Sequence, residues 1–254
     1  MKSSLSLKLT ALALAVSALF SIHAQAALSG DIVEDTYATI VGETSTGSIT
    51  VDNGENYTSS KGLFLGNSYS SPAGNAGYET FNMSGGSASL NSLYLGGGAQ
   101  GVGVLTLSAG TLTGGVINVA YSGNASGHIE MTGGTMSVSG LYLGGGSTET
   151  ASMNLLGGSF YSDSYVQIGT ASAQGHMVIS SKADVGLGGI WIGRSGKLTL
   201  VLDGGDGDFT RAVAGGRAQV VMLLPPGAEA HSFEPTPRDL IQAQQADLFV
   251  YNGG

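Results

Sequence analysis

The chain has 254 residues, of which 43 are glycine, 5 are proline and none is cysteine, and its formal net charge is −9 at pH 7. Glycine is far above its usual share of about 7%, but no G-X-Y period accompanies it, which excludes a collagen-like chain. Hydrophobic residues make up 42%, too many for a chain that is disordered throughout. The absence of cysteine excludes disulfides and thiolate metal sites. The negative charge argues against nucleic acid as a partner, because little here would neutralise phosphates.

Residues 1–26 have the pattern of an export signal. Lys2 and Lys8 precede an apolar run over residues 9–22, and Ala24-Gln25-Ala26 has the A-x-A form of a cleavage site. The run is shorter than the roughly 20 residues that a membrane-spanning helix needs, although an uncleaved anchor is the alternative. We therefore expect cleavage after Ala26, a mature chain without a transmembrane segment, and a location in the periplasm or at the surface or outside of a bacterium.

Residues 27–208 contain a repeat with a period of 24 residues. Each unit opens with an apolar-polar-apolar triplet, and a second triplet closes it. The first triplets begin at Phe81, Leu105, Ile129, Met153 and Met177, and the second at Leu93, Ile117, Leu141, Val166 and Ile190. Leu63-Phe64-Leu65 looks like the same element one irregular unit earlier. A pair of glycines or small residues usually follows the first triplet.

This pattern predicts a mainly β fold. The triplets have the period of two of a strand with one buried face, and the glycine pairs supply turns in which a positive φ costs little. Coils of 24 residues can stack so that equivalent strands pair and their inward side chains form a continuous core. We predict a right-handed parallel β-solenoid over residues 27–208. A globular β-sandwich is the alternative, but it does not account for the fixed period.

Two outward-facing features of the solenoid each allow a functional and a structural interpretation. The middle residues of the second triplets form one predicted column: Phe64, Tyr94, Asn118, Tyr142, Gln167 and Trp191. Its aromatic members could stack on sugar rings or on a partner, or they could simply support an exposed sheet. His128 and His176 lie two coils apart at equivalent positions, and we expect them to be surface residues.

Neither a calcium site nor an active site is predicted in this region. Residues 204–208, Gly-Gly-Asp-Gly-Asp, resemble a calcium-binding turn, but Phe209 replaces the last aspartate, so an acidic linker is the simpler interpretation. No Ser-His-Asp set or carboxylate pair recurs at a definable spacing. We therefore predict no catalytic residues and no enzyme.

The repeats resemble those of autotransporter passengers and related secreted bacterial β-helix proteins. The unit HIEMTGGTMSVSGLYLGGG, from His128 to Gly146, is an example, and the resemblance covers about residues 45–202. It implies adhesion or surface display, with a glycan or cell-surface partner for the solenoid.

Residues 209–254 differ abruptly in composition, and four of the five prolines fall there: Pro225, Pro226, Pro235 and Pro237. Residues 218–224 predict a buried strand, and residues 225–235 a loop. Thr236 as a cap, proline at the first helical position and Asp239 at the third predict a helix to about Ala246. Residues 248–251 predict a second strand. Strand, loop, helix and strand form the beginning of an α/β unit.

Two stretches of this segment resemble the solute-binding receptors of bacterial zinc and manganese ABC transporters. They are PPGAEAHSFEPTPRDL, from Pro225 to Leu240, and ADLFVYNG, from Ala246 to Gly253. The resemblance implies that His231 is a direct ligand of zinc or manganese, and that the ABC-transporter permease is the partner of a complete receptor. Glu234 and Asp239 belong to the same motif, and we interpret them as loop and cap residues.

The receptors of this family continue well beyond the matching segment, and their other ligands come from later residues. A zinc site needs three or four protein ligands, and residues 209–254, as a partial N-terminal lobe, supply one. We therefore expect an incomplete, truncated α/β segment whose metal binding is weak or absent. Two hypotheses remain: an exported protein carrying a fragment of a zinc or manganese receptor, or a secreted or surface structural or adhesion protein with a non-functional tail.

Overall fold

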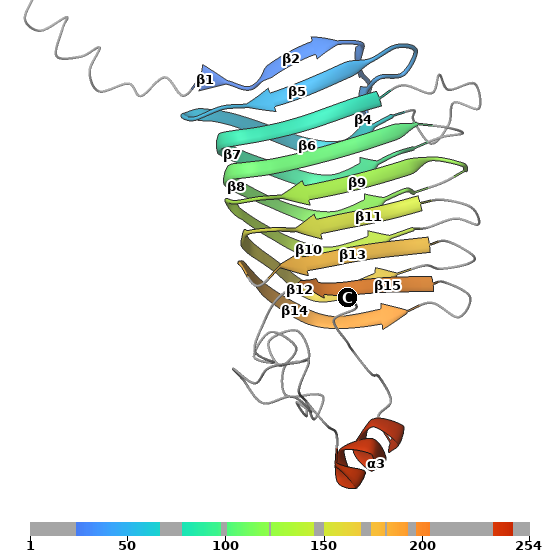
Figure 1. Ribbon diagram of the computed structural model, residues 1–254. Coiled ribbons are helices and arrows are strands. Elements are labelled where there is room, and N and C mark those ends of the chain that lie inside the picture. The colour runs from blue at the N-terminus through green and yellow to red at the C-terminus, as the bar shows by residue number, and fades with distance from the viewer. Residues whose placement is uncertain are drawn as a thin grey trace, which may run out of the picture.

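The computed structural model describes residues 24–66, 78–97, 101–121, 123–144, 150–168, 174–180, 182–192, 197–203 and 236–245. Within these ranges the chain forms a β-solenoid of about five turns, and one helix follows in the sequence (Figure 1). The predicted mainly β solenoid is therefore confirmed. The predicted strands over residues 218–224 and 248–251 lie outside the described residues, as do residues 204–208. No helix among the described residues is long and apolar enough to cross a membrane.

The solenoid is built from strands β1 to β15, and the helix is α3 (Pro237–Gln245). The strands are β1 (Ala24–Gln25), β2 (Ala27–Gly30), β3 (Ile32–Glu34), β4 (Ala38–Val41), β5 (Gly47–Val51), β6 (Glu55–Leu65), β7 (Tyr78–Leu95), β8 (Val102–Val119), β9 (Ser126–Met131), β10 (Thr135–Leu143), β11 (Thr150–Leu155), β12 (Gly158–Ile168), β13 (Gln174–Ser180), β14 (Ala183–Ile192) and β15 (Lys197–Asp203).

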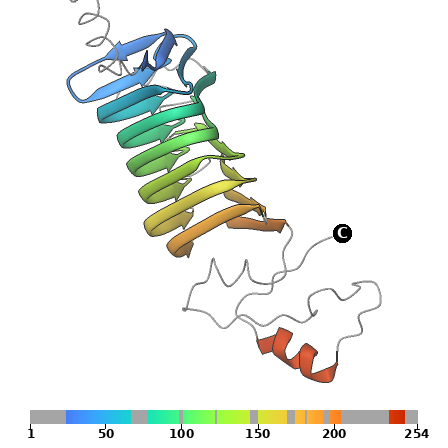
Figure 2. The ribbon, with the colours of Figure 1, turned by 90° about the vertical axis from the view of Figure 1, so that its left-hand side faces the viewer.

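The strands form two stacked rows, which we call the first face and the second face. The first face contains the initial part of β7 and β8 and then β9, β11, β13 and β15, all paired in parallel. The second face contains β6, the later part of β7 and β8, and then β10, β12 and β14. Figure 2 shows the coils stacked one on another along the solenoid. Strands β7 and β8 run through the bend and so belong to both faces.

The observed register confirms the 24-residue period. On the first face Leu105 pairs with Ile129, and Ile129 pairs with Met153. On the second face Leu93 pairs with Ile117, and Ile117 with Leu141. The irregular unit is confirmed as well, because Leu63 pairs with Leu93.

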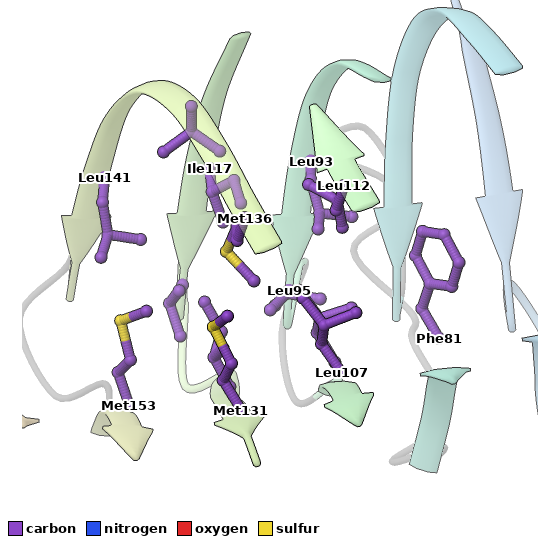
Figure 3. Packing of buried hydrophobic residues seen from close by; sticks show 14 of the residues in the cluster. Phe81, Leu93, Leu95, Leu107, Leu112, Ile117, Met131, Met136, Leu141 and Met153 are labelled. Atoms are coloured by element: carbon purple, nitrogen blue, oxygen red, sulfur yellow. The ribbon is translucent and has the colours of Figure 1, made fainter. Parts of the chain in front are cut away.

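The outer residues of each triplet make up the core. Ile129 and Met153 are fully buried, whereas the residues that follow them, Glu130 and Asn154, are only half-buried. In Figure 3 the side chains of the two faces point toward one another between the rows of strands. Each fully buried aliphatic side chain stabilises the fold by about 1.5–3 kcal/mol relative to an exposed one. A ladder of such residues therefore holds each coil to the next.

Glycine makes the bend between the two faces, as predicted. The second small residue after the first triplet has a positive φ in four successive coils: Gly86, Gly110, Gly134 and Gly158. At Gly110 a Cβ would also overlap the backbone of Gly85 in the coil below. The glycine is therefore required both by backbone conformation and by the close approach of neighbouring coils.

The N-terminal part of the solenoid differs from the predicted parallel coil. Strand β2 pairs antiparallel with β5, and β3 pairs antiparallel with β4. We call residues 24–51 the N-terminal cap. Strand β1 pairs with β6, and Ala26 is buried in the core. The expected cleavage after Ala26 would remove β1 from this sheet, and the export signal stays a prediction.

The second face also contains an irregularity, which lies within β12. Val138 pairs with Ser162, but Leu141 pairs with Val166, so β12 has one more residue than β10 between these two pairs. A bulge in β12 absorbs the extra residue. The residues before the bulge and the apolar triplet after it remain in register with β10 and β14.

Candidate functional site

Helix α3 is the described part of the segment that resembles a metal receptor. The backbone amide of Asp239 donates to Thr236 Oγ1 at 3.3 Å, and the amide of Thr236 donates to Asp239 Oδ2 at 2.8 Å. This reciprocal pair is the capping box that the sequence predicts, with Asp in place of Glu. Pro237 occupies the first helical position, and the helix ends at Gln245, one residue from its predicted end.

The charge on Asp239 also suits its position at the helix N-terminus. Hydrogen bonds from the Thr236 side chain and backbone hold the pKa of this carboxyl below its usual value, and the charge of Arg238 acts in the same direction. An ionised carboxylate is favourable at this end of a helix. The geometry therefore confirms the interpretation of Asp239 as a cap residue.

The same helix carries two apolar side chains in contact with solvent. Leu240 and Ile241 are each 53% exposed. Residues of this type at adjacent helical positions are usually buried against another element.

His231, the predicted metal ligand, lies outside the described residues, as does Glu234. Among the residues that the structure does describe, no group of three or more His, Asp or Glu side chains is arranged to hold a metal ion. The described solenoid therefore offers no alternative metal centre.

The predicted aromatic column is aligned as expected on the second face. Phe64 pairs with Tyr94, Tyr94 with Asn118, and Asn118 with Tyr142. The column continues to Gln167 and Trp191. The six positions thus form one line of neighbouring residues.

The ring geometry at the start of this column favours the structural interpretation. The rings of Phe64 and Tyr94 are stacked, with centroids 4.2 Å apart and planes 4° apart. The ring of Tyr121 meets that of Tyr94 edge to face at 4.9 Å. The facing sides of the Phe64 and Tyr94 rings are therefore occupied by each other and are not open to a sugar ring. These three aromatics therefore stabilise the sheet surface itself.

The first face contains a Ser-His-Glu set that the sequence interpretation missed. His128 Nδ1 and Ser152 Oγ share a hydrogen bond of 2.7 Å, and His128 Nε2 lies 3.7 Å from Glu130 Oε2. Ser152 pairs with both His128 and His176, so the two histidines lie two coils apart with the serine between them. The available signal was the period itself, because residues 128 and 152 differ by 24.

This set is better explained as a contact between coils than as a catalytic site. A nucleophilic serine also needs donors for the developing oxyanion and shelter from water. Ser152 instead lies on a sheet face, where the side chains of His128 and Glu130 are 30% and 44% exposed. A similar bond joins the preceding coils, since Thr106 Oγ1 donates to Asn82 Oδ1 at 2.7 Å. The two pairs lie in different columns of the first face, and each joins residues that are 24 positions apart in neighbouring coils.

The C-terminal segment is similar to a known family of metal receptors. The family model described as the periplasmic zinc-uptake complex component A, ZnuA, matches residues 207–254. The iron-binding protein YfeA of Yersinia pestis is 48% identical over 46 residues, which are 18% of this chain and 15% of that protein. No solved structure matches the chain.

Two further relatives are named for other metals, zinc and manganese. The high-affinity zinc uptake protein ZnuA of Bacillus subtilis is 44% identical over 45 residues, 18% of this chain and 14% of that protein. The manganese ABC transporter substrate-binding lipoprotein PsaA of Streptococcus pneumoniae is 39% identical over 46 residues, 18% of this chain and 15% of that protein. The chain thus spans about 15% of the length of these relatives. The predicted resemblance of the C-terminal segment to metal receptors is confirmed, and the resemblance of the solenoid to autotransporter passengers stays a prediction.

Proposed function

We propose that this chain is an exported protein in which a β-solenoid precedes a fragment of a metal receptor of the zinc and manganese ABC-transporter class. The observation that carries the proposal is the match over residues 207–254, which includes the stretch from His231 to Asp239. The capping box of α3 supports it, because Thr236, Pro237 and Asp239 of the motif have the local structure that the motif requires.

In this proposal His231 is the metal ligand of the fragment. A neutral imidazole is a common ligand of zinc, and the sequence predicts that the loop of His231 follows the carboxyl end of a strand, where α/β folds bind ligands. Relatives named for iron, zinc and manganese match the same 45 or so residues. The choice of metal therefore depends on ligands that the matched segment does not contain. The permease of an ABC importer would be the partner of the completed receptor.

A chimera tests whether the segment functions as part of a receptor. Residues 207–254 would replace the segment that they match in the B. subtilis zinc uptake protein, and zinc binding would be measured by calorimetry with a competing chelator. We expect the chimera to bind zinc, and the His231→Ala chimera to bind it about tenfold to a hundredfold more weakly or worse, since losing even a supporting residue costs that much. Glu234→Gln is the matched control, because it changes another residue of the same loop and leaves the imidazole in place.

Circular dichroism is used to establish that each chimera is folded, because only a folded chimera tests the proposal. A folded chimera whose zinc affinity is unchanged by His231→Ala would contradict the proposed role of His231. A folded chimera that does not bind zinc at all would contradict the receptor assignment of the segment.

A second candidate function belongs to the solenoid, as a structural or adhesive element at the cell surface. The observation that favours it is the long parallel stack of coils, which holds outward side chains in straight columns on two faces. A binding screen of the full chain against bacterial and host polysaccharides would test it. Binding that Tyr142→Ala weakens would support a role for the aromatic column, and binding that this change leaves intact would place the contact elsewhere.

A further inference from the structure

Glu79 is a buried acid in a column of very small residues. It lies in β7 and pairs with Gly103, and the column continues through Gly127, Ala151 and Gly175. The side chain of Glu79 is fully buried. At Gly103 a Cβ would already overlap the backbone of the coil below. A glutamate in this column therefore needs space that the other coils do not provide.

Two glycines of the preceding coils provide that space. Gly42 and Gly66 both have a positive φ, and a Cβ on Gly42 would lie 2.6 Å from Glu79 Cδ. A Cβ on Gly66 would lie 3.5 Å from Glu79 Oε2. The carboxyl group thus lies against the backbone where the N-terminal cap meets the first regular coil. Neither of its oxygens has a hydrogen-bond partner within the described part of the chain.

The charges around Glu79 make its ionised form unfavourable. Lys61 is the single Lys, Arg or His between residues 24 and 127, and it is already bound to Glu34 at 3.3 Å and to the Asp35 carbonyl. The charged residues on the adjoining segment of the cap are acidic, namely Asp31 and Glu43. The neighbour that directly follows β6 is Gly66, and the neighbour from β8 is Gly103.

Burial raises the pKa of the Glu79 carboxyl to about 7. The residue's own backbone amide acts in the opposite direction, and the negative charge of Asp31 acts in the same direction as burial. The group therefore changes its charge near neutral pH, whereas an exposed glutamate does so near 4.5. Ionisation inside an apolar environment without a partner is costly. The charged carboxylate gains hydration when the segment that covers it moves away.

We propose that Glu79 is a proton-operated latch, which in its neutral form lets the N-terminal cap pack on the first regular coil and in its ionised form releases it. The cap is joined to β7 by four residue pairs of β5, from Ser48 with Thr80 to Val51 with Met83. Gly42, which covers the carboxyl, lies in the same cap, five residues before β5 begins. Opening at Glu79 therefore loosens the cap, while β9 and β11, which do not adjoin Glu79, stay packed.

Hydrogen exchange of the full chain, followed by mass spectrometry from pH 5.5 to 8.5, tests the latch. After correction for intrinsic exchange, we expect protection of residues 38–51 to fall about tenfold or more from pH 6 to pH 8, while protection of β9 and β11 stays constant. Glu79→Gln keeps the shape but cannot ionise, so its cap should remain protected at every pH. Asp163→Asn, which removes an exposed carboxylate of β12, is the matched control and should behave as the unchanged chain does.

Two outcomes would overturn the proposal. One is cap protection that does not change with pH in the unchanged chain, and the other is a loss of protection that Glu79→Gln does not prevent. If Glu79→Gln does not fold, the titration of the Glu79 carboxyl can be followed by its NMR resonance in the ¹³C-glutamate-labelled chain. A titration midpoint near pH 4.5 would contradict the latch. The exchange experiment is repeated in EDTA and in millimolar calcium. If calcium abolishes the pH response, the group that controls the cap is a cation site and not a protonated carboxyl, and the proposal is overturned.

Discussion

Thr236 and Asp239 hold each other across the first turn of α3, the backbone amide of each donating to the side chain of the other. Each bond satisfies one of the amides that a helix N-terminus leaves without an intrahelical partner. The two residues are close in sequence, so the N-cap of α3 is formed entirely by residues of the motif that resembles a metal receptor.

Thr236→Ala should therefore destabilise α3 by about 1 kcal/mol, the usual effect of losing a capping hydroxyl. Hydrogen exchange of the amides from Asp239 to Gln245 in the full chain would measure the effect as a loss of protection. Gln244→Ala, an exposed change at the other end of the helix, is the control. Equal protection in the two variants would show that the cap does not hold the helix.

The free energy of unfolding should depend on pH through Glu79. Below pH 4.5 the carboxyl is protonated in both the folded and the unfolded chain, whereas above about 7 the folded chain must ionise a buried group. The pKa is raised on folding, so stability falls as pH rises between these values, by on the order of 3 kcal/mol. Urea denaturation should show that Glu79→Gln matches the unchanged chain at pH 4.5 and exceeds it at pH 8. A constant difference at both pH values would contradict this assignment.

Replacing Gly96 with alanine should destabilise the fold far more than replacing Gly54. Both have a positive φ, but a Cβ at Gly96 would overlap the Ser126 carbonyl, whereas a Cβ at Gly54 would meet nothing within 4 Å. Gly54→Ala should cost about 1–2 kcal/mol, the conformational strain alone, and Gly96→Ala should cost more because neighbouring coils must separate. Urea denaturation of the two variants compares them directly, and similar midpoints would show that the coils yield easily.

Met153 and Asn154 provide a test of the inward and outward positions of one strand. Met153 is fully buried and Asn154 is half-buried on the opposite side of β11. Met153→Ala should lower the free energy of unfolding by about 2–5 kcal/mol, whereas Asn154→Ala should change it by about 0.5 kcal/mol or less. The reverse order would contradict the inward assignment of the triplet.

The 254-residue chain itself should bind zinc no more tightly than a single surface imidazole does. A zinc site needs three or four protein ligands, and the matched segment offers His231. Titration calorimetry at neutral pH is the measurement, with His231→Ala as the comparison. A submicromolar affinity that His231→Ala abolishes would show that other ligands in this chain complete the site.

Much of the solenoid could be predicted because its period is a property of the sequence. A spacing of 24 residues placed Leu105, Ile129 and Met153 in one ladder, and it also contained the contact between His128 and Ser152. That contact was missed because residue types alone do not show that stacking makes neighbours of residues 24 positions apart. The period likewise aligned the aromatic column, although the stacking of aromatic rings within it depends on ring orientation, which spacing does not specify.

Other features of the structure depend on residues that do not follow the 24-residue repeat. The antiparallel pairing of β2 with β5 involves a segment without repeats, so the 24-residue period gives no register for it. The burial of Glu79 could not be predicted either, because it depends on Gly42 and Gly66, which are distant in sequence and become its neighbours only after stacking. The capping of α3 was predictable because it involves four consecutive residues.

The bulge in β12 shows where this kind of protein can change its length. An additional residue between Ser162 and Val166 leaves the residues before it and the apolar triplet after it aligned with the neighbouring coils. An insertion at such a position keeps the core side chains inward, while an insertion inside a triplet would turn apolar side chains outward. The stretch of the second face that precedes a triplet can therefore take in one residue, whereas the triplet itself cannot. A strand of unequal length thus marks a position where the chain can change its length and keep its core in register.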